Sequence, residues 1–373
     1  MKKPPLQTKS DKIYARQIAF AAAFLLPAAK FLETPSILAA NARGDLLLPA
    51  LLHSLVQALV LLAVLYTLSK SEISLLERLK RRLGKGIFVL YALYAAYFFF
   101  AAVLPLLDLE KFVYAAFFDT APTTFSFAVF FFFSAYVCAK SLKSIARSCD
   151  ICLFLFLFPF LALVAMSLSN ADFSSLMPLF GTNFSHSVTA FRRTIPHFSD
   201  AVLLLPLIAN LRYEKGDGVK IMSGYAVGTA FTLLLLAVFF GLFGSLSGRT
   251  HYAFSKIAQF FPALSIVGRI DLIFVYLLSV VLVFYTCLPL QYTTEFLCEI
   301  FRFQRKTYLS AVFNFLLLIG VLFLNRHYDR LYALISGDLD FIFLIFGVFL
   351  PLFLLFLPAH PAPKTQQKEK THA

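Results

Sequence analysis

The sequence contains no tryptophan and few charged residues: Asp, Glu, Lys and Arg make up 14% of its 373 residues. Soluble domains are about one quarter charged and about half apolar. This chain is 60% hydrophobic and has a mean hydropathy of +0.80. The composition excludes a soluble globular domain and predicts that lipid surrounds most of the chain. Without tryptophan, the aromatic belts at the membrane interfaces must come from the 16 tyrosines and the 46 phenylalanines.

Motifs of catalysis and metal binding are also missing. The five cysteines fit no disulfide framework, and Cys149-x-x-Cys152 has no second pair or nearby histidines that would complete a metal site. The sequence has no H-E-x-x-H, glycine-rich phosphate loop or serine nucleophile elbow. A transferase that uses His197 and Asp200 is the weakest functional hypothesis, because His-Phe-Ser-Asp is too short a motif. We therefore expect no enzymatic activity, no cofactor and no metal.

Apolar segments long enough to cross a bilayer recur along the whole chain. A spanning helix needs about 20 mostly apolar residues. We predict an all-α polytopic membrane protein with one domain at 14–358 and short tails at 1–13 and 359–373. The ten predicted helices are 14–41, 46–68, 86–107, 123–140, 148–169, 186–211, 220–246, 270–297, 307–325 and 339–358.

Basic residues alternate with these segments. The formal net charge is +13, and lysines and arginines gather before the first predicted helix, after the second, fourth, sixth and eighth, and in the tail. Ten helices place all of these regions on one face of the membrane. The positive-inside rule then predicts that both termini are cytoplasmic. Topological sorting explains the charge, so we expect no nucleic-acid partner.

Two of the predicted helices are interrupted, and they occupy matching positions in the two halves of the chain. Prolines 27 and 35 bracket a polar stretch in the first, and Pro196 follows Thr194 in the second. Proline removes a backbone donor, and lipid tolerates unpaired backbone groups only where they line a cavity in the protein. Interrupted helices in corresponding places are typical of a transporter-type binding site.

The first interruption carries two charged residues at membrane depth. Charges there face a cavity or a partner. Two interpretations stay open for Lys30 and Glu33: they neutralise each other at i,i+3, or one of them meets the charge of a substrate or a transported proton. Ala28 and Ala29 would let a ligand approach the backbone.

The second interruption has the residues of a helix start. Pro196 suits the first turn of a new half-helix with Thr194 as its cap, and a half-helix N-terminus can hold a carboxylate. Asp200 then caps or lines the same cavity, and we predict His197 to be a neutral, hydrogen-bonded packing residue. The predicted substrate-binding set is Ala28, Ala29, Lys30, Glu33, Thr34, Thr194, Ile195, Pro196 and Asp200.

Three stretches resemble spore germination permeases, the membrane B subunits of nutrient germinant receptors in the amino acid–polyamine–organocation superfamily. Residues 35–45 resemble the end of their helix one, 196–206 their helix six, and 266–274 the start of their helix eight. Together with the length and the ten-helix plan, the resemblance covers nearly the whole chain. The chain departs from its relatives in having Pro27-Ala-Ala-Lys30 where glycines are usual, and Asp200 where Glu is frequent.

The resemblance implies a LeuT-like fold with two inverted five-helix repeats, at about 14–169 and 186–358, and with helices one and six broken. It also implies a small nutrient ligand, typically an amino acid, between these two helices. Assembly with the receptor's A subunit and lipoprotein C subunit in the spore inner membrane would then couple ligand binding to germination. The alternative is a secondary active transporter of amino acids or similar small solutes, and the sequence leaves both open.

Overall fold

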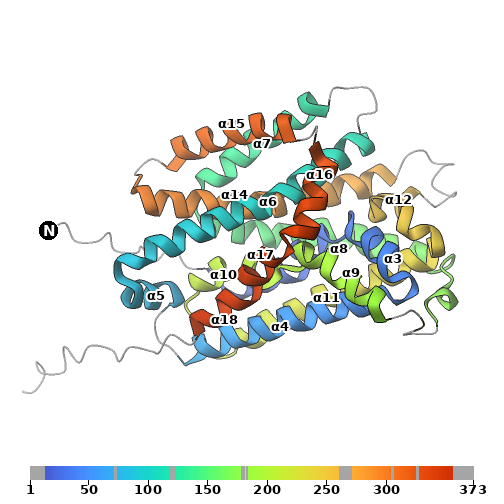
Figure 1. Ribbon diagram of the computed structural model, residues 1–373, viewed down its shortest axis with the longest axis horizontal. Coiled ribbons are helices and arrows are strands. Elements are labelled where there is room, and N and C mark those ends of the chain that lie inside the picture. The colour runs from blue at the N-terminus through green and yellow to red at the C-terminus, as the bar shows by residue number, and fades with distance from the viewer. Residues whose placement is uncertain are drawn as a thin grey trace, which may run out of the picture.

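Helices account for almost all of the chain that can be described. The computed structural model describes residues 13–70, 74–117, 123–177, 181, 184–259, 271–303, 306–324 and 327–355. No strand occurs within these ranges, and the one β-type contact is an isolated bridge between Ile13 and Leu211. The helices lie side by side along one long axis (Figure 1). The expectation of an all-α protein is confirmed.

The helices follow the predicted apolar segments, with two interruptions and several π-helical turns. The first half contains α1 (Ala15–Phe20), the π-helix η1 (Ala21–Leu25), α2 (Leu26–Ala29), α3 (Thr34–Ala42), α4 (Leu47–Ser69), α5 (Leu75–Leu83), α6 (Ile87–Phe117), α7 (Thr123–Ala139) and α8 (Leu142–Ser167). The second half contains α9 (Phe184–Thr194), the 3-10 helix η5 (Ile195–Phe198), α10 (Asp200–Ala209), α11 (Asp217–Phe243), α12 (Ala253–Gln259), α14 (Asp271–Phe301), α15 (Lys306–Leu324), α16 (Tyr328–Ala333), α17 (Asp340–Leu344) and α18 (Leu350–Leu355). The π-helices η8 (Leu334–Asp338) and η9 (Ile345–Phe349) join α16, α17 and α18.

Six helices in the described ranges are long and apolar enough to span a membrane: α4, α6, α8, α11, α14 and α15. The segments Ala15–Ala29 and Thr34–Asp45 pass the same test of length and apolarity when taken together, and they bend by 64° at the break between them. Shorter apolar helices cover Phe127–Ala139 and Asp340–Phe353. The protein is thus a multi-pass membrane protein, and the count of ten spans stays a prediction.

Two helix boundaries differ clearly from the predicted ones, and one helix was not predicted. Helix α6 runs on to Phe117 instead of ending at 107, so Asp108 lies within the helix with its side chain buried. Helix α8 begins at Leu142 and not at 148. The amphipathic helix α5 occupies the basic region after the second span and buries Leu75 and Leu79. Residues 266–270 of the third resemblance motif lie outside the described residues.

Two groups of helices enclose the interrupted segments. Helices α6, α14, α7 and α15 pack on one another along one side, and α4 and α11 lie on the opposite side (Figure 1). Helix α2 contacts both α11 and α14, and α10 contacts both α4 and α14. The two interrupted segments therefore lie at the junction of the groups, where backbone groups freed by a break can face protein and not lipid.

The first interrupted segment packs very closely on α11 through two glycines. A Cβ at Gly224 would come within 2.4 Å of the Ala19 carbonyl oxygen, and one at Gly228 within 2.3 Å of the Ala22 oxygen. Small residues four apart allow such backbone contact between membrane helices. The contact fixes α1 and η1 against α11 and holds the start of the break in place.

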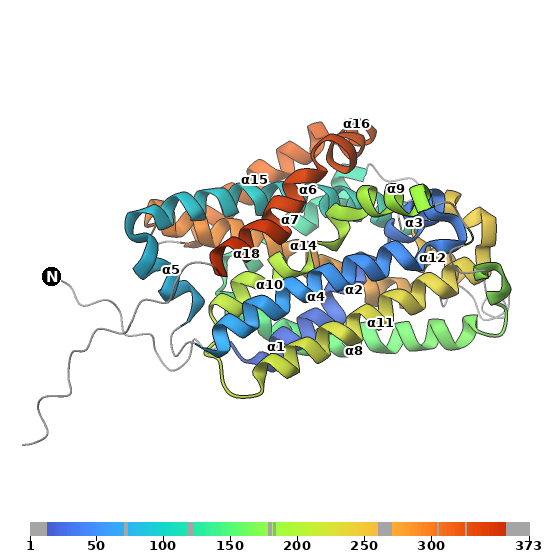
Figure 2. The same ribbon diagram turned by 60° about the horizontal axis from the view of Figure 1, so that its bottom comes forward.

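The ends of the described chain lie at one end of the bundle. Helices α5 and α18 lie there, whereas α3, α9 and α12 lie at the opposite end (Figure 2). Ile13 pairs with Leu211 in the connection between α10 and α11. Which end faces the cytoplasm stays a prediction from the positions of the basic residues.

Candidate functional site

The first break lies between the two prolines that predicted it. Helix α2 ends at Ala29, and α3 begins at Thr34. Amide groups of α12 occupy the freed carbonyls: Ala253 N donates to Leu32 O and Phe254 N to Phe31 O, each at 3.1 Å. Two of the carbonyl groups freed by the break are thus hydrogen-bonded within the protein. Fewer unpaired backbone groups remain than the two prolines alone suggest.

The second break has a different start from the predicted one. Pro196 belongs to the short 3-10 helix η5, and the helix beyond the break begins at Asp200. Thr194 forms no side-chain cap; its hydroxyl donates to Ala190 O at 2.7 Å. Helix α10 is capped from α4 instead, because Gln57 Oε1 accepts a 3.0 Å hydrogen bond from Ala201 N. A polar side chain from another helix satisfies the amide that the break exposes.

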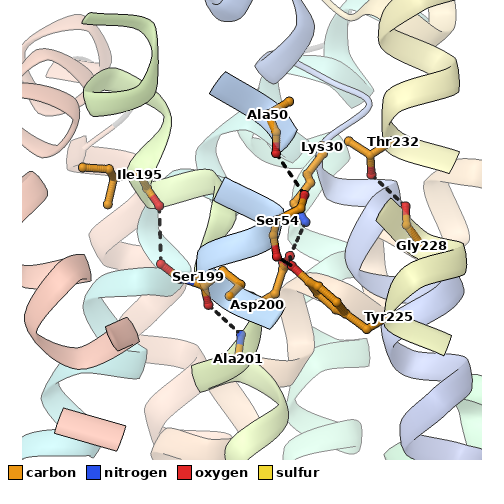
Figure 3. Close-up of polar contacts among 11 residues, drawn as sticks. Lys30, Ala50, Ser54, Ile195, Ser199, Asp200, Ala201, Tyr225, Gly228 and Thr232 are labelled. Atoms are coloured by element: carbon orange, nitrogen blue, oxygen red, sulfur yellow. Dashed lines mark hydrogen bonds and ion pairs between the residues drawn. The ribbon is translucent and has the colours of Figure 1, made fainter. Parts of the chain in front are cut away.

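A buried ion pair joins the two breaks. Lys30 Nζ lies 2.6 Å from Asp200 Oδ2, and the two side chains are 5% and 4% exposed. The Tyr225 hydroxyl donates to the same oxygen at 3.2 Å, and the Phe198 ring centre lies 4.8 Å from Nζ, within the range of a cation–π contact. Figure 3 shows Lys30 pointing to Asp200 with Tyr225 beside them.

Glu33 has separate partners. Its Oε2 lies 2.9 Å from His251 Nδ1 and 3.4 Å from the Ser36 hydroxyl. The interpretation of Lys30 and Glu33 as a self-neutralised pair is therefore wrong, since each reaches a different helix or loop. Sequence spacing permits an i,i+3 pair, but the unwound residues 30–33 no longer place the two side chains on one helical face.

A small cavity of about 30 Å³, room for one or two water molecules, lies between the breaks and helices α6, α14 and α17. We call it the central cavity. Its lining is Ala29, Leu32, Ala101, Leu104, Pro105, Asp108, Leu109, Pro196, His197, Leu282, Tyr285, Thr286 and Phe343. Most of these are apolar, and four side chains can form hydrogen bonds. Small-molecule sites typically combine an apolar lining with a few such groups.

Two polar residues that line the central cavity, His197 and Asp108, have few hydrogen-bond partners. Neither ring nitrogen of His197 has a hydrogen-bond partner among the described residues, so its predicted role as a hydrogen-bonded packing residue is wrong. Asp108 Oδ1 accepts a 2.6 Å hydrogen bond from the Tyr328 hydroxyl. The cavity thus offers a carboxylate on α6 and an imidazole on η5 to a bound molecule.

Two further cavities lie on either side of the central cavity. We name them outer and inner after the orientation predicted from the basic residues. The outer cavity, of about 560 Å³, is lined by charged and aromatic residues that include Glu33, Lys111, Arg193, His251 and Tyr328. The inner cavity, of about 120 Å³, is mostly apolar and lies between α5, α6, α10 and α14. Helices α6 and α14 line both the central and the inner cavity.

The amino-acid sequence shows to which protein family the chain belongs. A family described as spore germination protein matches residues 12–329. The chain belongs to this family. No curated protein matches it.

Solved transporters share the fold of this permease-like protein. MhsT in complex with L-phenylalanine superposes with a TM-score of 0.62 at 13% identity, covering 93% of this chain and 89% of that chain. A mutant of the Eremococcus coleocola manganese transporter gives 0.55 at 14%, covering 91% and 78%. Mhp1 in an inward-facing conformation gives 0.51 at 13%, covering 93% and 77%. At these identities the likeness shows the fold alone, which is LeuT-like with broken first and sixth helices.

The structure of this family member separates the nine predicted site residues into four groups. Ala29 and Pro196 line the central cavity. Lys30 and Asp200 form the ion pair, and Glu33 lines the outer cavity. The remaining four, Ala28, Thr34, Thr194 and Ile195, are buried in the packing around the breaks and do not line the central cavity.

None of the nine cavity residues outside the two interruptions was predicted, and four of these are Asp108, Tyr285, Thr286 and Phe343. One of them had a signal in the sequence. Asp108 follows Pro105 by three residues at the end of a long apolar run, and an acid within a membrane helix usually marks a functional position. The other three are ordinary residues of apolar segments, and only the packing of α14 and α17 brings them to the cavity.

Proposed function

We propose that this permease-like protein is the ligand-sensing membrane subunit of a spore germinant receptor, and that a small nutrient, an amino acid, binds in the central cavity when the surrounding helices move apart to widen it. The observation that carries the proposal is the lining of that cavity by both interrupted segments. Ala29 comes from the first, and Pro196 and His197 come from the second. A molecule bound there contacts both breaks at once.

The lining favours a small amphiphilic ligand. Leucine, alanine and phenylalanine side chains form most of the wall, while Asp108, His197, Tyr285 and Thr286 offer hydrogen bonds. A ligand with a compact apolar part and charged or polar ends matches that distribution. Such a ligand would signal by binding one packing of the helices more tightly than another, which shifts the population between them. Assembly with A and C subunits in the spore inner membrane, with cytoplasmic termini, belongs to this proposal.

A ligand screen by thermal stabilisation tests the binding step, because a compound that binds the folded state raises the melting temperature. Ala101→Phe is the test variant, since Ala101 lines the central cavity. Ala92→Phe is the matched control, since Ala92 lies on an exposed face of the same helix. We expect amino acids to raise the Tm of the wild type and of Ala92→Phe but not of Ala101→Phe. Equal stabilisation of all three proteins would place the ligand elsewhere.

A second candidate, secondary active transport of amino acids or similar solutes, is favoured by the order of the cavities. The outer, central and inner cavities follow one another along α6, with Lys111, Ala101 and Tyr91 as one lining residue of each. Uptake of a radiolabelled ligand into proteoliposomes under a proton or sodium gradient separates the two functions. Binding without uptake favours sensing, and gradient-driven accumulation favours transport.

A further inference from the structure

We propose that Lys30 is a built-in counter-ion: it supplies from the chain itself the single cation that buried Asp200 requires. If a shorter side chain replaces Lys30, the space that its ammonium group occupies should become a binding site for small primary ammonium ions. This inference concerns the contact between the two breaks and does not depend on which nutrient binds.

The burial of Asp200 makes a cation necessary. Its side chain is 4% exposed, so water cannot solvate the carboxylate, and a buried charge without a partner is strongly unfavourable. Two other groups contribute only partly. The N-terminus of α10 carries roughly half an elementary charge, and the Tyr225 hydroxyl donates one neutral hydrogen bond at 3.2 Å. Neither replaces a full positive charge.

Lys30 meets this requirement with well-placed contacts. Its Nζ lies 2.6 Å from Asp200 Oδ2 and 4.8 Å from the centre of the Phe198 ring. Among the ion pairs of the described residues, no other cation reaches Asp200. Glu33, the other acid close to Lys30 in sequence, pairs with His251 instead. The His53 imidazole is engaged by Phe191 O and the Thr194 hydroxyl, and neither nitrogen of His197 has a partner among the described residues, so neither imidazole is bonded to Asp200.

Because the cation is covalently attached, the contact between the breaks is independent of the ions in solution. The wild-type protein should therefore have the same Tm in choline, sodium, potassium or methylammonium chloride at equal ionic strength. Lys30→Ala removes the cation and leaves an enclosed space between an aromatic face and a carboxylate. Methylammonium can fill that space, since it keeps the N–H donors for Asp200 and the positive charge beside Phe198.

The experiment is a thermal unfolding series on the purified full chain in detergent or nanodiscs. In choline chloride, Lys30→Ala should melt below the wild type. Addition of methylammonium should raise the Tm of Lys30→Ala in a saturable way and recover most of the loss, while tetramethylammonium, which lacks N–H donors, should not. Lys30→Met is the matched control, because its side chain occupies the space without a charge, and it should gain nothing from methylammonium. Asp200→Asn added to Lys30→Ala should abolish the rescue.

Three results would overturn the inference. These are a Lys30→Ala protein as stable as the wild type in choline, equal rescue of Lys30→Ala and Lys30→Met, or rescue that survives Asp200→Asn. If Lys30→Ala does not fold, the pair Lys30→Met with Asp200→Asn decides instead: it removes both charges and should be more stable than Lys30→Met alone, and no gain would refute the counter-ion role. The failure of a nutrient to bind would leave all of these outcomes unchanged, so the two proposals fail separately.

Discussion

The Tyr328 hydroxyl donates a 2.6 Å hydrogen bond to Oδ1 of Asp108. Tyr328 lines the outer cavity and Asp108 lines the central cavity, so this bond lies in the wall that separates them. It also links α16 to α6, two helices that are distant in sequence. The ammonium group of Lys111 lies 3.2 Å from the centre of the Tyr328 ring and holds its other side.

We expect Tyr328→Phe to loosen this wall. The variant leaves a buried carboxylate oxygen without its donor, which costs about 1–3 kcal/mol. Ligand exchange between the outer side and the central cavity should become faster, with a lower Tm. Stopped-flow measurement of ligand dissociation checks the first effect and thermal unfolding the second. Tyr332→Phe removes a hydroxyl from the same outer cavity and is the control. Equal dissociation rates in the two variants would show that the hydrogen bond does not close the wall.

The close contact of α11 with the first interrupted segment gives a second prediction. Gly228→Ala places a Cβ about where the Ala22 carbonyl oxygen lies, since their separation would be 2.3 Å. Backbone atoms cannot move as a flexible side chain does, so we expect a clear loss of stability, on the order of 1–3 kcal/mol as for other overpacked sites. Gly320→Ala is the matched control, because a Cβ there meets no atom within 4 Å.

The control variant carries its own expectation. Alanine has a better helix propensity than glycine by about 1 kcal/mol, so Gly320→Ala should leave the Tm unchanged or raise it. If Gly320→Ala loses as much stability as Gly228→Ala, both losses come from the bilayer or detergent and not from the contact between α11 and the first interrupted segment. Thermal unfolding of both variants in one detergent makes the comparison.

The sequence predicted the breaks but not their partners, and the reason is physical. Prolines and polar residues act on the local backbone, so Pro27, Pro35 and Pro196 mark the interruptions together with the polar residues near them. Proline alone does not suffice, because prolines also lie inside the continuous helices α6, α8 and α14. The partner of Lys30 depends on a contact with a residue 170 positions away. Glu33, three residues away, was the nearest acid in sequence but not in space. Local rules reach a few turns of helix, and an ion pair between breaks is set by tertiary packing.

The position of Asp108 illustrates the same limit. The predicted helix ends at 107, directly before this acid, whereas α6 continues past Asp108 to Phe117. The helix continues because Tyr328 satisfies the carboxylate, which lets Asp108 lie buried within the bundle. His197 was expected to be packed and hydrogen-bonded, but the central cavity leaves both of its nitrogens without a partner among the described residues.

The ion pair between Arg192 and Asp340 should contribute much less than the Lys30–Asp200 pair. Arg192 Nε lies 2.6 Å from Asp340 Oδ2 and joins α9 to α17, but the arginine side chain is 66% exposed. Water screens such a pair, and exposed pairs contribute about 0–1 kcal/mol. We expect Arg192→Gln to shift the Tm only slightly, and less at high salt. A loss as large as that of Lys30→Met would mean that the outer ends of α9 and α17 determine stability.

The wall between the central and inner cavities consists of aromatic rings and gives the last prediction. Phe98 is fully buried, lines the inner cavity and lies 5.0 Å from the Tyr292 ring. Tyr292 in turn donates a 2.9 Å hydrogen bond to Leu203 O, which fixes its ring against α10. Truncation of Phe98 to alanine should therefore join the two cavities, at a stability cost of about 3–5 kcal/mol.

Accessibility of a cysteine one turn along α6 measures this opening. Ala101 lines the central cavity, so Ala101→Cys should react slowly with a small charged thiol reagent from the inner side. We expect Phe98→Ala to increase the rate at least several-fold, in a background where the partly exposed Cys298 is replaced by serine. Phe99→Ala is the control, because Phe99 is 42% exposed and faces away from both cavities. If Phe98→Ala and Phe99→Ala react alike, the barrier lies elsewhere, and the order of cavities no longer supports transport as the second candidate function.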